Sequence, residues 1–172
     1  LAVWGSPGSG KTTTAVKLAK YLADKKKDVA LLLCDSTTPM IPCICPPGEL
    51  EGDHSLGSIL VANAITQTLL KQGCNTHKRM RHLAVIGLQK GESERCYPTA
   101  PTELIRQLLE ALRDMASYVV IDCSSYIYFD ELSAMSILEA DAVLRLMNCD
   151  LKSVSYLSSQ QEYLKMGGFD FD

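Results

Sequence analysis

One eight-residue stretch constrains this chain more than any other feature. Residues 5–12 read GSPGSGKT, directly after the apolar residues 1–4, and they match the pattern G-x-x-x-x-G-K-[ST]. Because glycine lacks a Cβ, such a loop can turn tightly and direct successive backbone N–H groups toward one point. A helix that begins at the end of the loop adds its own unpaired amides and the positive end of its dipole. The pattern therefore predicts a strand, a phosphate-binding loop and a helix in immediate succession.

The residues of this loop have separate predicted roles. Lys11 is placed to reach the β- and γ-phosphates of a nucleotide as a point charge, and the Thr12 hydroxyl to take one coordination position of Mg²⁺. A glycine-rich turn that binds no ligand is the alternative, but the apolar strand before the loop and the helix after it favour nucleotide binding. The predicted nucleotide-binding residues are Gly5, Ser6, Gly8, Ser9, Gly10, Lys11, Thr12 and Thr13.

The rest of the chain alternates between strand-like and helix-like patterns. Short apolar runs predict strands at 28–35, 83–88, 118–125 and 142–147, and helical periodicity predicts helices at 11–26, 57–72, 129–139 and 152–166 with a further one opening at Pro101. The proline- and glycine-rich residues 36–56 are expected to form a long surface loop. This order predicts an α/β fold with a doubly wound, mostly parallel sheet flanked by helices. We expect one P-loop nucleotide-binding domain over residues 1–172, truncated at both ends.

Two aspartates end predicted strands. Asp122 ends the apolar run VVID and Asp35 ends the run VALLLCD. Parallel α/β sheets bind ligands beyond the carboxyl ends of their strands, so Gly5, Asp35 and Asp122 are expected to converge there. A hard cation prefers oxygen ligands, so Asp122 is predicted to help hold Mg²⁺ beside the nucleotide, through water, with Thr12 as the other protein ligand.

Composition excludes some classes of function. The net charge of −3 provides no overall attraction to nucleic acid or to an anionic membrane. No apolar run is long enough to span a bilayer. The seven cysteines form no disulfide framework and predict reduced thiols in the cytoplasm. Cys43 and Cys45 lack a second ligand pair, which favours a loop over a metal site, and the basic run HKRMRH (77–82) is interpreted as a solvated loop rather than a DNA contact.

Several segments in a fixed order resemble the ParA/MinD family of partition and positioning ATPases. They are GSPGSGKTTTAVKLAKYLADKKKDVALLLCD, then SLGSILVANAI, YVVIDCSS and LEADAVLRL, and together they cover nearly the whole chain. The resemblance implies a cytosolic ATPase switch that binds ATP with Mg²⁺ and dimerises face to face around the nucleotide. It also implies ATP and ADP states that differ in affinity for a partner protein, DNA or a membrane.

Three departures from the family pattern bear on hydrolysis. Members commonly carry a lysine after the first glycine, where this chain has Ser6, and a second aspartate two residues after the first, where it has Thr37. Threonine can hydrogen-bond water but carries no charge to polarise it. The family often has a proline or glycine two positions after this aspartate, whereas here Ser124 and Ser125 follow. Lys90, Arg95 or another group could substitute for the missing charges.

The predicted function is therefore a Mg·ATP-binding switch for partitioning or positioning, with slow or partner-stimulated hydrolysis. Lys11, Asp35 and Asp122 are the predicted catalytic residues. A nucleotide-binding scaffold that does not hydrolyse ATP is the alternative, and a phosphoryl-transfer or ligase enzyme on the same fold is less favoured. The segment SYIYFDE (125–131) could sense the γ-phosphate, contact a partner, or pack in the core.

Overall fold

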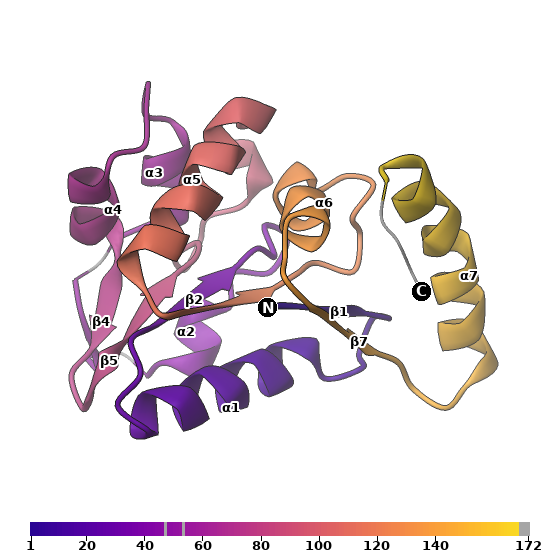
Figure 1. The fold of residues 1–172 in the computed structure, drawn as a ribbon, viewed down its shortest axis with the longest axis horizontal. Helices are drawn as coiled ribbons and strands as arrows, with labels where there is room; N and C mark the ends of the chain where they lie inside the picture. Colours follow the sequence, from indigo (N-terminus) through magenta and orange to yellow (C-terminus); the bar gives the residue numbers. More distant parts are fainter. Residues whose placement is uncertain (47, 53, 169–172) are drawn as a thin grey trace.

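Seven strands form one twisted sheet at the centre of the molecule (Figure 1). The computed structural model describes residues 1–46, 48–52 and 54–168. The strands lie in the order β3-β4-β5-β2-β6-β1-β7. Their bounds are β1 Ala2–Gly5, β2 Val29–Leu33, β3 Leu50–Glu51, β4 Asn75–His77, β5 Met80–Ile86, β6 Tyr118–Asp122 and β7 Val143–Leu146. The five strands from β5 to β7 pair in parallel, whereas β3 and β4 are antiparallel additions at one edge.

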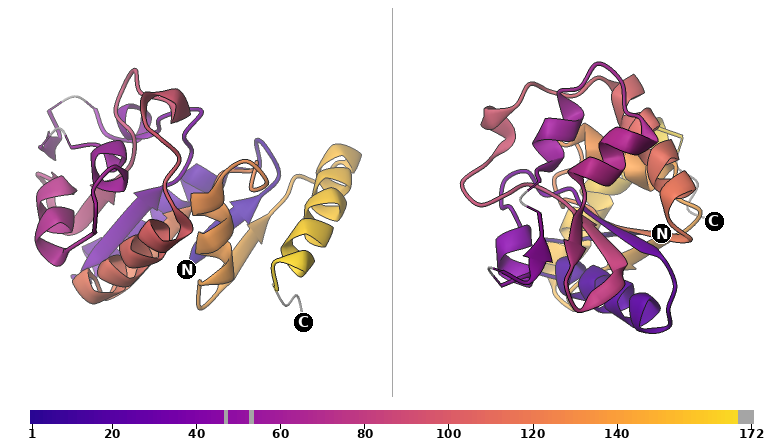
Figure 2. Two further views of the ribbon diagram at one scale, coloured as in Figure 1. Left: turned by 90° about the horizontal axis from the view of Figure 1, so that it is seen from above. Right: turned by 90° about the vertical axis from the view of Figure 1, so that its left-hand side faces the viewer.

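Helices cover both faces of the sheet (Figures 1 and 2). Helices α1 and α2 lie on one face, α3 to α6 on the other, and α7 lies at the β7 edge. Their bounds are α1 Lys11–Asp24, α2 Ile41–Ile44, α3 Leu56–Leu60, α4 Gln67–Gly73, α5 Thr102–Met115, α6 Glu131–Leu138 and α7 Leu151–Met166, with a 3₁₀ turn η1 at Glu94–Cys96. The predicted doubly wound, mostly parallel α/β sheet is confirmed. No helix in the described ranges is both long and apolar enough to cross a bilayer.

Strand β2 shows why the central strands are continuous apolar runs. All five of its residues are buried. Ala30 and Leu32 face the cluster under α5, whereas Val29, Leu31 and Leu33 face the cluster under α1. A parallel strand with helices on both faces has no solvent side, so polar residues do not alternate along it.

The predicted helix over 57–72 is wrong, because two short helices stand there. Helix α3 ends at Leu60, and α4 begins only at Gln67. The Thr66 side chain accepts a hydrogen bond from the Leu69 amide, which is the geometry of a helix N-cap. The apolar periodicity continued across this break, so periodicity alone could not reveal it.

The segments 36–56 and 77–82 are also more structured than expected. Residues 36–56 include α2 and the edge strand β3. The run HKRMRH ends β4 and begins β5, so it forms an antiparallel hairpin rather than a loop. Buried Asn75 supports this hairpin, since its side-chain amide donates to the carbonyl of His54 at 2.8 Å. The sequence NTH lacks the apolar residues of a typical strand, so β4 was missed.

Candidate nucleotide-binding site

The strand order brings three chain segments together at the carboxyl ends of the strands. Strand β6 lies between β1 and β2, with Asp122 in register with Val3 on one side and Leu33 on the other. Since all three strands run in parallel, their carboxyl ends meet there. The loop after β1, Asp35 after β2 and Asp122 of β6 are therefore neighbours.

The glycines of the loop after β1 meet two different requirements. Gly8 and Gly10 have φ angles of 73° and 85°, a left-handed backbone conformation that residues other than glycine rarely adopt. Gly5, whose φ angle is 155°, is required by packing as well. A Cβ on Gly5 would lie 1.8 Å from the carbonyl oxygen of Leu146 in β7, and the following amide, of Ser6, donates to that same oxygen at 3.0 Å.

Helix α1 begins at the end of this loop with no side chain capping its amides. Its N-cap residue is Gly10, and no side-chain hydrogen bond caps the helix. The first-turn N–H groups thus face the loop at the positive end of the helix dipole. A cavity of about 380 Å³ lies here, lined by Pro7, Gly8, Gly10, Lys11, Thr12, Thr13, Asp35, Asp122, Cys123, Ser124, Ser125 and Tyr126.

Asp122 is a buried carboxylic acid at the floor of this cavity. Its exposed fraction is 2%, and its Oδ1 atom has no hydrogen-bond partner. Burial raises the pKa of Asp122 from 3.8 to about 6, while the Thr12 hydroxyl and the Lys11 charge lower it by smaller amounts. A buried carboxyl oxygen without a partner is costly, and a cation in the cavity would satisfy it.

Lys11 lies across the same cavity and is held by oxygen atoms of the protein. Its Nζ atom donates to the Ser125 hydroxyl at 2.5 Å and to the Ser6 carbonyl at 3.2 Å. Burial lowers the pKa of Lys11, and the carboxylates of Asp122 and Asp35 partly offset that effect. Sequence reasoning did not identify Ser125 as a contact of this lysine. The only available signal was its position three residues after Asp122.

The structure brings most, but not all, of the predicted site residues into the cavity. Gly8, Gly10, Lys11, Thr12, Thr13, Asp35 and Asp122 line it, whereas Gly5, Ser6 and Ser9 are not among its lining residues. Ser9 instead closes the loop, with its hydroxyl donating to the Ser6 carbonyl at 2.7 Å. Asp35 organises the next loop, because its Oδ1 atom accepts from the amides of Thr37 and Thr38 at 2.9 Å each.

The donor set at this cavity fits Mg²⁺ better than a metal held by protein alone. No group of three or more His, Cys, Asp or Glu side chains that could hold a metal occurs in the described part of the chain. Mg²⁺ is commonly bound by one or two protein oxygens, water and substrate phosphates. Thr12 and the free Oδ1 atom of Asp122 would hold it, and the ion would neutralise charge on the phosphates.

Comparison with known proteins assigns the chain to a family. A family model described as "AAA domain" matches residues 5–166. The chain belongs to this AAA domain family. An uncharacterised ATP-binding protein of Methanocaldococcus jannaschii is 28% identical over 152 residues, which are 88% of this chain and 53% of that protein. The chain thus spans about half the length of this curated relative.

Solved structures show the same fold as this AAA domain. MinD of Pyrococcus horikoshii, complexed with Mg-ADP, matches with a TM-score of 0.71 at 14% identity over 98% of this chain and 66% of MinD. Apo McdA of Cyanthece matches with a TM-score of 0.72 at 19% identity, over 96% of this chain and 64% of McdA. The kinase domain of Escherichia coli tyrosine kinase ETK matches with 0.71 at 19% identity (98% and 63%). The predicted resemblance to the ParA/MinD proteins is confirmed, and at these identities the neighbours show the fold alone.

Two residues of this AAA domain that depart from the ParA/MinD pattern, Ser6 and Thr37, have defined surroundings in the structure. Ser6 stands where a lysine is common, and its side chain is buried with an Oγ atom that has no partner. Thr37 stands where a second aspartate is common, and its hydroxyl donates to the Glu94 carboxylate at 3.4 Å. Thr37 is not among the residues that line the phosphate-side cavity.

The three aromatic side chains that follow Asp122 are exposed, so the core-packing interpretation is wrong for them, although Ile127 between them is buried in the core. Tyr126, Tyr128 and Phe129 have exposed fractions of 60%, 66% and 85%. Tyr128 packs edge-on against Phe129 and against Tyr163 of α7, with ring centroids 5.0 and 5.3 Å apart. Tyr126 itself lines the cavity.

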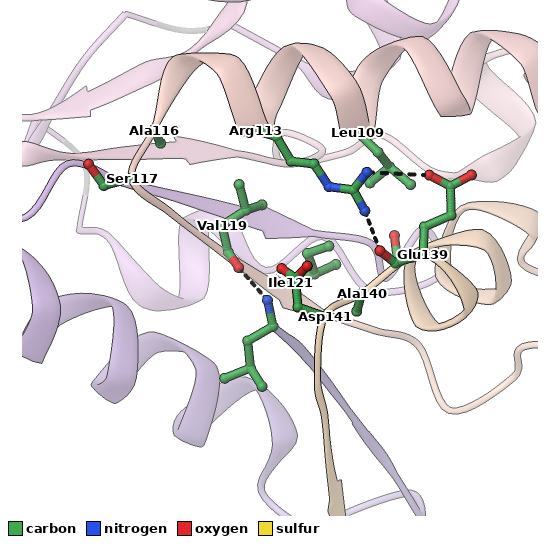
Figure 3. A pocket seen from close by; sticks show the side chains of 11 residues that line it. Leu109, Arg113, Ala116, Ser117, Val119, Ile121, Glu139, Ala140 and Asp141 are labelled. Atoms are coloured by element: carbon green, nitrogen blue, oxygen red, sulfur yellow. Dashed lines mark hydrogen bonds and ion pairs between the residues drawn. The ribbon is translucent and has the colours of Figure 1, made fainter. Parts of the chain in front are cut away.

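A different cavity of this AAA domain, of about 190 Å³, lies at the opposite ends of the strands (Figure 3). Arg113 of α5 donates to the Glu139 carbonyl and pairs with the Glu139 carboxylate at 3.9 Å. Its remaining walls include Leu109, Val119 and Asp141. Since Val119 is near the start of β6, this cavity is remote from the glycine loop.

Proposed function

We propose that this chain binds Mg·ATP in the cavity beyond β1, β6 and β2 and acts as a nucleotide-dependent switch. One observation carries the proposal: a buried carboxyl oxygen without a partner, on Asp122, and a partly buried ammonium, on Lys11, line the same glycine-rich cavity. Mg²⁺ complements the first group and phosphate the second. The helix dipole of α1 adds a further positive field at the phosphate position.

Two named relatives support this ligand. The Methanocaldococcus jannaschii relative is described as ATP-binding, and the Pyrococcus horikoshii MinD neighbour was crystallised with Mg-ADP. In the proposed complex Lys11 contacts the β- and γ-phosphates, the loop amides surround the β-phosphate, and Thr12 and Asp122 hold the Mg²⁺ shell, with Asp122 acting through water. Asp35, which also lines the cavity, would orient water beside the ion.

Hydrolysis is proposed to be slow or to depend on a partner. A water nucleophile needs a group that orients it and takes up its proton, and the second carboxylate expected after Asp35 is replaced by Thr37. That hydroxyl is directed to Glu94. These observations also favour a second candidate, a scaffold that binds nucleotide without hydrolysing it. The phosphoryl-transfer alternative has less support, because the described residues contain no recognisable motif for binding an acceptor.

The proposed switch would pass its state to a partner. A complex of MinC with MinD from Aquifex aeolicus is among the structures that match this fold, with a TM-score of 0.62 at 14% identity. By analogy we propose that the ATP and ADP forms of this chain differ in affinity for a protein partner or a second copy of the chain. The seven free cysteines are consistent with the cytoplasm as its location.

Calorimetry with ATP and ADP in the presence of Mg²⁺, followed by phosphate release on the same sample, tests the proposal. Lys11→Ala is the loss-of-binding variant, and Lys17→Ala, an exposed lysine on the same helix, is its matched control. Binding that Lys11→Ala abolishes and Lys17→Ala retains supports the site. Phosphate release above that of Lys11→Ala identifies a working ATPase, and binding without release identifies the scaffold. No binding by the unmodified chain refutes the proposal.

A further inference from the structure

Ser125 connects the phosphate-side lysine to the backbone of β1. Its hydroxyl accepts a hydrogen bond from Lys11 Nζ at 2.5 Å and donates one to the Gly5 carbonyl at 3.0 Å. The Ser125 side chain is buried, with an exposed fraction of 6%. In this structure the Lys11 ammonium, at the wall of the cavity, therefore has two oxygen atoms of the protein as partners.

A bound triphosphate would compete with Ser125 for this ammonium. Hydrogen bonds between two charged groups are stronger than those from a charged donor to a neutral hydroxyl. Lys11 and Ser125 line the same cavity, so phosphate oxygens placed there approach the same donor. The ammonium is then drawn toward the ligand, and the Ser125 hydroxyl loses its donor.

The segment that contains Ser125 is attached to α7 at two points. The Tyr156 hydroxyl donates to the Ser125 carbonyl, and Tyr128 packs against Tyr163 with ring centroids 5.3 Å apart. Burial raises the pKa of Tyr156 to about 12, so it remains a donor at neutral pH. The ring of Tyr156 also lies 6.1 Å from that of Trp4, in β1.

Helix α7 is attached to the rest of the protein by few buried side chains. It lies beyond the β7 edge of the sheet (Figures 1 and 2). Of its sixteen residues, only Ser153 and Leu164 are buried, whereas Leu151 and Val154 are exposed by 88% and 48%. Its other apolar contacts with the core come from the partly buried side chains of Tyr156, Leu157 and Tyr163. An element held mainly by partly buried side chains opens at a lower free-energy cost than a fully buried one, so a change in its anchoring contacts alters its order.

We propose that Ser125 is a positioning residue that holds Lys11 in the nucleotide-free protein, and that ATP binding releases this contact and loosens α7 through Tyr156. The inference rests on the proposed ATP site, and it adds the part of the protein that would respond to ATP there, namely α7. Nucleotide occupancy at the glycine loop then changes the order of α7.

Ser125→Ala tests the first step. Without the competing hydroxyl, Lys11 keeps the Ser6 carbonyl and water as partners, and ATP is expected to bind about three- to tenfold more tightly by calorimetry. Ser136→Ala is the matched control, because Ser136 is a buried serine whose hydroxyl has no partner and which lines the opposite cavity. Its ATP affinity should equal that of the unmodified chain. Unchanged or weaker binding by Ser125→Ala overturns the assignment, since a merely structural serine would not tighten binding when removed.

Hydrogen exchange of residues 151–166 tests the second step, with and without saturating Mg·ATP. ATP should accelerate exchange in the unmodified chain. Tyr156→Phe keeps the ring beside Trp4 but lacks the donor to Ser125, so its exchange should already be fast and should not respond to ATP. Tyr163→Phe, on the same helix, keeps its ring contact and should respond as the unmodified chain does. ATP binding without any change in α7 exchange, or a full response in Tyr156→Phe, refutes the coupling alone. Absence of ATP binding by calorimetry refutes the proposed function and the coupling with it.

Discussion

Asp122→Asn is expected to stabilise the nucleotide-free protein at pH 7 and to weaken Mg·ATP binding. Burial raises the pKa of Asp122 from 3.8 to about 6, so at pH 7 the folded protein carries a carboxylate that burial disfavours. At about 1.4 kcal/mol for each pH unit of difference, ionised Asp122 costs at most about 3 kcal/mol of folding free energy. Asparagine has a similar shape and no charge to desolvate. In a domain of this size, 3 kcal/mol corresponds to a rise of about 6–12 °C in the unfolding temperature.

The sign of the pH dependence follows from the direction of the shift. A carboxyl group with a raised folded-state pKa binds its proton more tightly in the folded protein than in the unfolded chain. Its stabilising contribution is fully present below pH 3.8 and is lost as the pH rises through about 6. The stability advantage of Asp122→Asn should therefore be largest at pH 7 and should shrink toward zero as the pH falls to about 4.

Urea unfolding between pH 4 and pH 7 measures this difference, because the titrating groups that do not interact with Asp122 cancel between the two proteins. Asp114→Asn, at an exposed position of α5, is the control, and it should change stability by less than about 0.5 kcal/mol at every pH. Calorimetry of both variants should show weaker Mg·ATP binding only for Asp122→Asn. A stability difference for Asp122→Asn that is negative or independent of pH would refute the account of this carboxylate.

Three further outcomes follow from the structure. Gly5→Ala should destabilise the protein by more than about 3 kcal/mol in urea unfolding, because the added Cβ would overlap the backbone of β7. Gly91 also has a positive φ but has open space around it, so Gly91→Ala should cost only about 1 kcal/mol. Equal losses in the two variants would contradict the packing argument. Leu108→Ala should cost about 2–5 kcal/mol in the same assay, since this side chain is fully buried in the cluster under α5. Mg·ATP binding near pH 6 should release protons from Asp122, seen as a buffer-dependent heat in calorimetry that is reduced in Asp122→Asn; equal heats in the two proteins would contradict it.

The central parallel strands β1 and β2 could be predicted from the sequence because they have no solvent side. The five residues of β2 are all apolar and all buried, and such runs are distinctive. The edge was not predictable in the same way. β4 contains Asn75, whose side chain replaces apolar packing with hydrogen bonds to His54 and Val85, and no periodicity records such bonds. The break between α3 and α4 could not be predicted either. The N-cap residue Thr66 is a single residue, and the apolar pattern continues on both sides of it.

Much of the candidate site could be predicted, because its chemistry requires adjacent residues or strand ends. Lys11 and Thr12 are neighbours in the first turn of α1, and Asp122 is the last residue of β6. The contact between Lys11 and Ser125 could not be predicted, because it joins residues 114 positions apart through the insertion of β6 beside β1. The hydrogen bond from Thr37 to Glu94 depends likewise on two loops meeting beyond the strands. Spacing along the chain carries no information about such meetings.

The pKa shifts of Asp122 and Lys11 have one cause and are relieved by different parts of one ligand. Burial raises the pKa of the carboxyl group and lowers that of the ammonium, so both shifts favour neutral side chains. The two groups offset each other only in part, because Asp122 retains a free oxygen while Lys11 turns to Ser125. Mg²⁺ supplies the positive charge that Asp122 lacks, and phosphate supplies the negative charge that Lys11 lacks. Because the charged groups of this site lack full partners in the absence of ligand, they favour a ligand that presents both charges side by side. The same incomplete pairing lowers the folding stability of the ligand-free protein, and Asp122→Asn measures by how much.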